Sequence, residues 1–568
     1  MRDALPAAAF PAVAVAVPAT TEPRVLSRLT ALLWCSALAV TAVGLAAMAW
    51  LAPRVLYADP WRFTQSLLEL PWPRNVLASD NGHREILPNL VRYAELVWLQ
   101  GNQWLQIITG MLLAVLSLAG LACILRRDAA APVARAAGVL TAALSLFWVG
   151  SQRVLTHANE TVHAYLITAL LIAGVAALLR GGWRGAAMAA LCGIAATFSF
   201  GSGVAVFVGF AAVLVVRRAP WQHWLVLAAG AALAVGVHLG MGNTGMRSDI
   251  VLAPLRQLDL LLRWLASPFI YAAWPLLDPA IAQQLPVAPL RAAVGGAASA
   301  YQSVFGPVMG ARWPHLLLGL AGVATLLAMS WRSWHRGRTA SAGETVALTL
   351  AWFGLAVGGL IALGRMGYFV DYPDQLSAPR YVLWSWLFWC GLVLWAVVRI
   401  GPRRPRRTAG LALLLALALL PSTVWMGMLG LGMQRVASAT ATAVAAGVVD
   451  PAQVHGETVL SEMQSALPVV RAQRISMFAW PETRYLQGER VGLAGTAVAI
   501  RGAALAPVEN ALGGPGWRID FDAESSAKRL VLQCGDRPVG LALRAGGRWT
   551  GWATGPLETA CLGALQLR

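Results

Sequence analysis

Two stretches of the chain concentrate side chains capable of acid–base or anion-binding chemistry. The run Ser79-Asp80-Asn81-Gly82-His83-Arg84-Glu85 places four ionisable groups in six positions, and the segment 365–381 holds two arginines, two aspartates and three tyrosines. A carboxylate can accept the proton of a hydroxyl group, and arginine offers phosphate a permanently charged, bidentate fork. We therefore predict a catalytic base at Asp80, with Glu85 as its alternative, and phosphate recognition by Arg365 and Arg380.

Each of these features also has a purely structural explanation. Asp80 could begin a helix or occupy a turn, and an arginine at a membrane boundary can extend its charge into water. His83 and Glu85 could ligate a metal, but a single His-x-Glu pair is a weak signal when no second cluster is near it in sequence. We predict no metal site and no certain cofactor, and a divalent cation stays an option.

Further polar side chains are expected to bind substrate around the acidic group. The segment 151–162 is more polar than a turn between two apolar stretches requires, and it supplies Arg153 and His157. Together with His83, Arg84 and Tyr381, these residues complete the predicted substrate-binding set.

The composition places these residues in a membrane protein. The chain of 568 residues is 58% hydrophobic and only 12% charged, with a mean hydropathy of +0.61, whereas a soluble chain is about 25% charged. Apolar segments approaching the roughly 20 residues that cross a bilayer lie at 29–51, 104–124, 133–150, 163–179, 185–201, 203–217, 223–241, 314–330, 344–364, 382–398 and 409–433. Within 185–217, the Gly201-Ser202-Gly203 run either joins two short spans or bends one re-entrant hairpin.

The net charge of +18 indicates orientation rather than an anionic partner. Fifteen arginines and only two acids fall in five short loops, which the positive-inside rule assigns to the cytoplasm. The N-terminus is then inside and the C-terminus outside. Because no basic run alternates with aromatic residues, a nucleic-acid partner is excluded. Arg365 and Arg380 fall on the outer side, against the rule, and this position favours a binding role.

The predicted fold class is an all-α polytopic membrane bundle of about 11 transmembrane helices, with a small C-terminal extracytoplasmic β-rich domain. Residues 1–28 form a disordered cytoplasmic lead-in, and 29–433 form the transmembrane domain with outer loops 53–103, 242–313 and 365–381. Residues 434–568 form an outer linker and the β-rich domain, because polar and apolar residues alternate there as in strands. Cys534 and Cys561, the two cysteines of this tail, form a disulfide or remain two buried thiols.

This organisation resembles that of the GT-C type of bacterial integral-membrane glycosyltransferase. Local motifs of modest specificity are similar to those of poorly characterised proteins of this type: Asp80-Asn81-Gly82-His83-Arg84-Glu85-Ile86-Leu87-Pro88, Ala196-Thr197-Phe198-Ser199-Phe200-Gly201-Ser202-Gly203, and Gly364-Arg365 followed by Arg380-Tyr381. One departure is that the usual paired-acid element is missing, since Asp80 and Glu85 are five residues apart.

The resemblance implies an enzyme of the bacterial inner membrane that moves a hexosyl or pentosyl group from a polyprenyl-phosphate carrier. The acceptor would be a surface glycan, lipid or protein on the outer face of the membrane. Asp80 would then act as the base, and Arg365 and Arg380 would bind the lipid phosphate. The alternatives are a lipid-linked glycan polymerase or ligase, a flippase, or a non-catalytic envelope assembly protein.

Overall fold

A bundle of apolar helices forms the main body of the protein. The computed structural model describes residues 24–127, 131–241, 252–273, 287–454, 456, 458–489, 495–545 and 547–567. The long helices of the bundle are α1 (Arg24–Leu51), α5 (Trp104–Arg126), α6 (Pro132–Phe147), α8 (Ala158–Arg180), α9 (Gly182–Thr197), α10 (Val206–Arg217), α11 (Trp221–Gly240), α16 (Arg312–Arg336), α17 (Ala342–Gly364), α19 (Val382–Ile400), α20 (Pro405–Ala418) and α21 (Leu420–Ala445). Helix α1 begins at Arg24, inside the segment assigned to the lead-in, and residues 1–23 lie outside the described residues.

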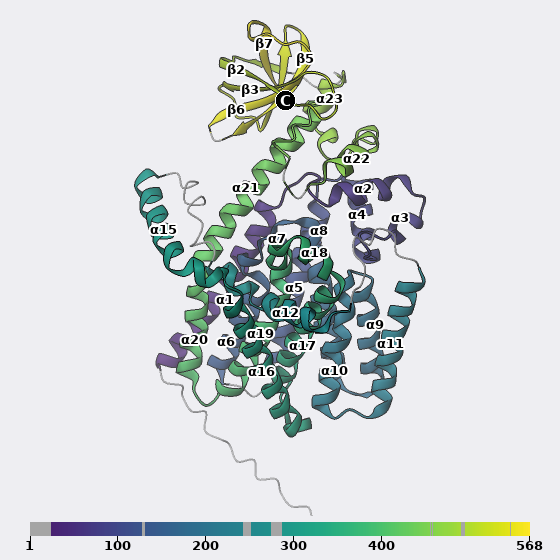
Figure 1. Ribbon diagram of the computed structural model, residues 1–568, viewed down its shortest axis with the longest axis vertical. Helices are drawn as coiled ribbons and strands as arrows, with labels where there is room; N and C mark the ends of the chain where they lie inside the picture. The colour runs from purple at the N-terminus through teal and green to yellow at the C-terminus, as the bar shows by residue number, and fades with distance from the viewer. Residues whose placement is uncertain are drawn as a thin grey trace, which may run out of the picture.

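The helices confirm the predicted polytopic membrane fold. Among the described residues, nine helical segments are long and apolar enough to cross a bilayer, and the shorter 201–217 segment is apolar as well. The region 185–217 consists of two antiparallel helices, α9 and α10, joined at Phe198–Phe200 and the 3-10 turn η2 (Gly201–Ala205). Helix α9 packs between α8 and α11, whereas α10 packs on α17 (Figure 1).

Apolar side chains lie both inside the bundle and on its outer surface. Small residues let the helices approach closely in the interior: the backbone of Gly391 in α19 lies against that of Ala347 and Ala351 in α17. Outward-facing leucines are instead left uncovered by protein, and Leu411, Leu414 and Leu417 of α20 are 61–68% exposed. Such a surface is stable where lipid replaces water.

The arginine-rich loops gather at one end of the bundle. Arg217 and Arg218 donate hydrogen bonds of 3.2 Å to the carbonyl oxygens of Arg338 and Trp334. Glu344 forms ion pairs with Arg336 (2.5 Å) and Arg399 (3.9 Å). Three loops that the positive-inside rule assigns to the same compartment therefore meet in space, and which compartment they face stays a prediction.

The segment between α11 and α16 contributes one helix to the bundle. Helices α12 (Pro254–Leu265), α13 (Ser267–Ala273) and α15 (Ala288–Gly310) are described, whereas 242–251 and 274–286 lie outside the described residues. Trp264 of α12 is 1% exposed, and Gly358 of α17 leaves room for its ring. Helix α12 thus packs against α16 and α17.

Short helices cover the end of the bundle opposite the arginine-rich loops (Figure 1). They are α2 (Pro60–Glu69), α3 (Arg74–Leu77), α4 (Ile86–Leu99), η1 (Val149–Ser151), α7 (Gln152–Thr156), α18 (Met366–Asp371), η5 (Pro373–Ser377) and η6 (Pro379–Tyr381). Helix α21 rises from the bundle at this end and leads to α22 (Leu460–Ala472), η7 (Ser476–Ala479) and α23 (Pro481–Leu486). The polar segments 79–85, 151–162 and 365–381 lie at this end.

The C-terminal domain is a curled antiparallel sheet, which confirms the predicted β-rich domain. Its strands are β1 (Gly495–Val498), β2 (Arg501–Val508), β3 (Gly516–Asp522), β4 (Arg529–Cys534), β5 (Arg537–Ala545), β6 (Arg548–Thr554) and β7 (Leu562–Leu567), in the order β1-β7-β4-β5-β6-β3-β2. A flat sheet of seven strands would be about 29 Å across, yet its two edge strands are joined by only two residues, which reach about 11 Å. The sheet must therefore roll up, enclosing Phe521 and Trp549.

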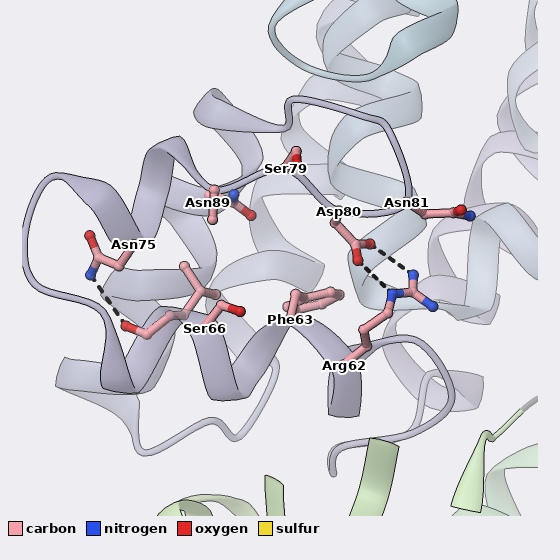
Figure 2. A pocket seen from close by; sticks show the side chains of 10 residues that line it. Arg62, Phe63, Ser66, Asn75, Ser79, Asp80, Asn81 and Asn89 are labelled. Carbon is pink, nitrogen blue, oxygen red and sulfur yellow. Dashed lines mark hydrogen bonds and ion pairs between the residues drawn. The ribbon is translucent and has the colours of Figure 1, made fainter. Parts of the chain in front are cut away.

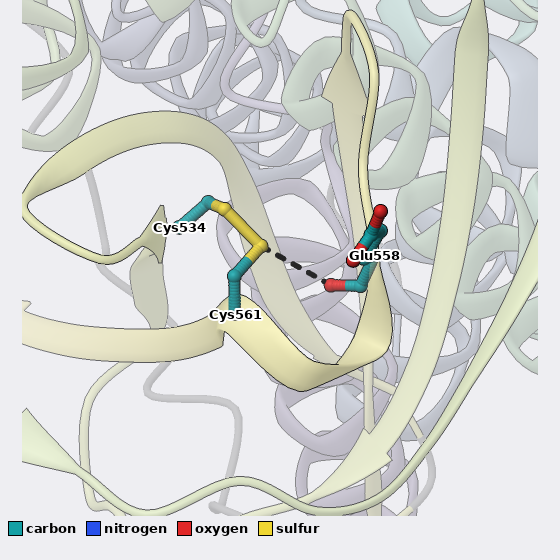
Figure 3. Close-up of a disulfide and its surroundings, with 3 residues drawn as sticks. All are labelled: Cys534, Glu558 and Cys561. Carbon is teal, nitrogen blue, oxygen red and sulfur yellow. Dashed lines mark hydrogen bonds between the residues drawn. A yellow bond between two sulfur atoms is a disulfide. The ribbon is translucent and has the colours of Figure 1, made fainter.

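Cys534 and Cys561 form a disulfide that ties the end of β4 to η8 (Thr559–Cys561), the turn that precedes β7. The bridge closes a loop of 27 residues, and Cys561 Sγ also lies 3.2 Å from the carbonyl oxygen of Glu558 (Figure 3). In the chain-entropy model such a loop is worth about 3.5 kcal/mol of stability.

Candidate functional site

Two carboxylates from different parts of the first loop meet at one arginine. Arg62 donates two hydrogen bonds to Asp80, of 2.5 Å to Oδ1 and 2.8 Å to Oδ2, and a third of 3.2 Å to Oδ1 of Asp59 (Figure 2 draws Arg62 and Asp80). Asp59 precedes the first turn of α2 without capping it, and Arg62 lies one helical turn further on. Asp59 and Asp80 are thus brought to the same guanidinium.

A tight turn fixes the position of Asp80. Asp80 and His83 exchange two backbone hydrogen bonds, of 2.9 Å and 2.8 Å, around Asn81 and Gly82. Both central residues have positive φ, +48° and +77°, which is the geometry that an Asn-Gly pair adopts most readily in a two-residue hairpin. The Asn-Gly pair therefore forms the turn that presents the Asp80 carboxylate to Arg62.

Asp59 lies among positive charges. Its Oδ2 is 3.6 Å from Arg153 of α7, which also donates a 2.6 Å hydrogen bond to Glu160. Burial raises the pKa of Asp59, but Arg153, Arg62 and the more distant Arg380 outweigh burial and hold the pKa below its usual value. Asp59 is therefore ionised at neutral pH, and its side chain is 39% exposed against 16% for Asp80.

Glu85 is held in a buried ion pair. It pairs with Arg92 of α4, which in turn donates a 2.6 Å hydrogen bond to Asn89 and lies over the ring of Phe63. Burial raises the pKa of Glu85 to about 7, and the charge of Arg92 limits the rise. Since its side chain is only 5% exposed, this arrangement suits a residue that holds α4 in place.

His83 connects two of the sequence motifs. Its ring lies 4.2 Å from that of Phe200, whose other neighbour is the ring of His163 at 4.3 Å. A Cβ atom at position 201 would collide with His83 Nδ1, so Gly201 allows this close approach. Burial and the charge of Arg365 lower the pKa of His83 to about 4, and the imidazole is neutral at pH 7.

Two of the predicted substrate-binding residues, Arg84 and His157, bond to backbone carbonyl oxygens. Arg84 donates 2.7 Å hydrogen bonds to the carbonyl oxygens of Leu77 and Met241. His157 Nε2 lies 3.2 Å from the carbonyl oxygen of Tyr57, two residues before Asp59. Arg84 and His157 therefore support the site through the backbone that surrounds it.

Arg365 and Arg380 reach the same end of the bundle from the loop that precedes α19. Arg380 donates a 2.9 Å hydrogen bond to Gln375 and lies 5.0 Å from the Tyr381 ring, while Arg365 lies 5.9 Å from the Tyr368 ring. Within the described part of the chain, neither arginine takes part in an ion pair with Asp or Glu (the ion pairs found involve other arginines). Both are half-buried, and the charge of Arg380 also acts on Asp59.

The C-terminal linker is bound to the backbone that carries Asp59. Ser476 Oγ accepts a 3.1 Å hydrogen bond from the Leu56 amide, and Thr458 Oγ1 accepts one of 3.2 Å from the Ala58 amide. On α22, Glu462 lies 3.6 Å from Arg62, and this helix packs along α2. The linker thus forms one wall of the site rather than a free tether.

The variant Thr458→Val is expected to loosen this wall. It removes the acceptor for the Ala58 amide, a loss of about 1 kcal/mol, and amide exchange in the peptide around Ala58 should speed up about fivefold. Hydrogen–deuterium exchange with mass spectrometry measures this change. Ser438→Ala, which removes only a bond to its own helix α21, is the matched control. Equal exchange rates around Ala58 in the two variants would show that the Thr458 hydrogen bond does not hold this backbone.

Sequence reasoning missed Asp59, Arg62 and Glu462. Asp59-Pro60 reads as an ordinary helix start, and Glu462 is about 400 residues away in a linker. The one available signal was the spacing of Asp59 and Arg62. Asp59 directly precedes a short amphipathic helix, and Arg62 lies three residues later in its first turn. As for metals, no group of three His, Cys, Asp or Glu side chains with a metal-binding arrangement occurs among the residues that the structure describes.

The fold and the site define a polytopic helical membrane protein with a C-terminal β-domain and a charged site at the end nearest to that domain. No protein-family model and no curated protein matches the chain. Among solved structures, the chain is similar to the crystal structure of ArnT from Cupriavidus metallidurans in the apo state. The match covers 83% of this chain and 96% of that chain, at 13% identity and a TM-score of 0.34. This likeness concerns the arrangement of elements, and no residue role is taken from it.

Proposed function

We propose that the protein is a membrane glycosyltransferase that takes a sugar from a polyprenyl-phosphate carrier and transfers it to a hydroxyl group. The proposal rests mainly on one observation. The carboxylates of Asp59 and Asp80 share Arg62 at the end of an apolar bundle, where Arg365 and Arg380 form no ion pair among the described residues. This arrangement offers a base and an anion site next to a lipid-facing surface.

The chemistry follows from these groups. The acceptor oxygen attacks the anomeric carbon, the bond from that carbon to the phosphate oxygen breaks, and the electron pair leaves with the lipid phosphate. Arg365 and Arg380 stabilise the charge that develops on the phosphate. The acceptor proton passes to a carboxylate.

We assign the proton to Asp59. Both oxygens of Asp80 accept hydrogen bonds from Arg62 at 2.8 Å or less, whereas the Asp59 contacts are longer, 3.2 and 3.6 Å. Asp59 is also the more exposed of the two carboxylates, so it has lone pairs free for a substrate. Asp80 would then hold Arg62. Glu85, buried against Arg92, would position α4.

The compartment belongs to this proposal as well. With the arginine-rich loops in the cytoplasm, the site and the β-domain lie outside the bacterial inner membrane. Nucleotide sugars are absent there, which is why a lipid-phosphate donor fits. Acceptors on that side are a surface glycan, a lipid or a protein.

A reconstituted assay tests the proposal. The full-length protein in nanodiscs is supplied with radiolabelled polyprenyl-phosphate sugars and a membrane extract, and label is followed into glycan, lipid and protein fractions. In parallel, surface glycans of a deletion strain are compared with those of a strain carrying Asp59→Asn. Loss of the same glycan in both strains is the expected result. Normal glycans in both, together with no label transfer, would reject a transferase.

The variant Arg153→Gln should change the pH dependence of transfer. Asp59 must be ionised to accept a proton, and Arg153 lowers its pKa. Without Arg153 the pKa of Asp59 rises, so the acid limb of the rate profile moves to higher pH and activity is lost first on the acid side. The rate–pH profiles of wild type and variant measure the shift. An unchanged acid limb would assign the base to another residue.

A further inference from the structure

A cavity of about 270 Å³ has the Arg62–Asp80 pair in its wall. It lies among α2, α3, the Asp80 turn and the start of α4 (Figure 2). Its lining residues are Arg62, Phe63, Ser66, Leu67, Asn75, Ala78, Ser79, Asp80, Asn81 and Asn89. The volume is at the lower end of the range for small-molecule sites, about 300–1,000 Å³.

The charges on the wall exclude an anionic occupant. Among the lining residues, all within the described part of the chain, only Arg62 and Asp80 are ionisable, and the charge of Arg62 is already engaged by Asp80, Asp59 and Glu462. A phosphate or carboxylate would need uncompensated cations. The cavity therefore differs in chemistry from the anion site at Arg365 and Arg380.

The remaining polar groups are amides and hydroxyls held in place by the fold. Asn75 donates a hydrogen bond of 3.2 Å to the carbonyl oxygen of Leu67 and accepts one of 2.9 Å from the Val76 amide. Asn89 donates a hydrogen bond of 3.2 Å to the Val76 carbonyl oxygen and accepts one from Arg92. Since an amide has two N–H donors and two lone pairs, each side chain keeps one donor and one acceptor beyond these bonds, in a fixed orientation.

The wall also has an apolar side, from Phe63 and Leu67 of α2. Ser66, on the same helix, and Asn81 are further polar lining residues. A sugar ring has the matching composition, with hydroxyl groups around its edge and C–H groups on its faces.

We propose that this cavity is a subsite for a neutral sugar ring. This subsite deepens the proposed glycosyl transfer and rests on it, because a sugar in the cavity would touch Asp80 and Arg62, and Arg62 also holds Asp59. The ring is either that of the lipid-linked donor or that of a glycan acceptor. Both carry the same hydroxyl-rich chemistry, and neither would bring charge into the cavity.

Binding is tested without turnover. Saturation-transfer NMR on the full-length protein in nanodiscs uses methyl glycosides of neutral hexoses and pentoses as probes, with inorganic phosphate as competitor. At least one glycoside should bind saturably, at roughly millimolar Kd, and phosphate should not displace it. If no glycoside binds, the cavity holds water only and the proposal is wrong.

Filling the cavity locates the binding. Ser66→Trp places a large ring inside it and should weaken glycoside binding about tenfold or more. Leu70→Trp, at the exposed end of the same helix, is the matched control and should leave binding unchanged. Ser66→Leu replaces Ser66→Trp if that variant does not fold. Binding that survives both cavity variants would overturn the proposal.

Two further experiments distinguish a donor sugar from an acceptor sugar, and failure of the sugar site from failure of the proposed function. With the radiolabelled lipid donor, a Ser66→Trp protein that still hydrolyses donor slowly but transfers no sugar has lost its acceptor subsite. Loss of donor hydrolysis as well assigns the cavity to the donor ring. If glycosides bind the wild type but no lipid-linked sugar is ever turned over, the proposed function fails while the sugar site stands.

Discussion

The substitution Asp59→Asn is expected to reduce sugar transfer by about 10²–10⁴-fold, the usual contribution of a positioned general base. Asparagine keeps the size of the side chain and can still accept a hydrogen bond from Arg62, but it cannot take up a proton at neutral pH. The KM for the lipid donor should change little, because the proposed phosphate ligands are untouched. Initial rates with purified protein in nanodiscs measure both quantities.

Two comparisons sharpen this result. Asp374→Asn alters an exposed carboxylate on the loop before α19, and its rate should match wild type. Asp80→Asn should also slow transfer, by releasing Arg62, and it is expected to raise the KM of the sugar that lies in the adjacent cavity. If Asp80→Asn abolishes transfer while Asp59→Asn keeps wild-type rates, Asp80 is the base, as the sequence predicts.

The substitution Arg380→Gln is expected to cost about 10²–10³-fold in kcat/KM for the lipid donor, as the loss of one donor to a developing oxyanion does. Arg380 is half-buried beside Tyr381 and contributes to the positive potential at Asp59. Its removal weakens donor binding and the stabilisation of the departing phosphate together. Steady-state kinetics with varied donor concentration separate the two effects.

The conservative variant is the informative control. Arg380→Lys keeps the charge but replaces the bidentate fork by a point charge, so partial recovery of activity is expected. Arg537→Gln, which removes an exposed arginine of β5 in the C-terminal domain, should have no effect. Full activity in Arg380→Gln would show that this arginine only anchors its loop at the membrane boundary.

The local elements of the site were open to prediction because their signals are short-range. Asn81-Gly82 predicts a turn from two residues, and the apolar stretches predict spans from their length alone. Arg365 and Arg380 stand out because the positive-inside rule can be applied to each loop separately, and their loop falls on the outer side. By contrast, the partner of Asp80 could not be found this way. Arg62 lies eighteen residues earlier, and nothing in the spacing says that the loop folds back on α2.

The sequence by itself determined that the chain crosses a membrane several times, that its arginine-rich loops share one side, and that a β-rich domain with a cysteine pair follows. These properties depend on composition and local periodicity, which each segment carries alone. Only the tertiary structure decided which acids lie together. Asp59, Asp80 and Glu462 come from a helix start, a turn and a distant linker, and they converge because helix packing brings all three within 3.6 Å of the Arg62 guanidinium.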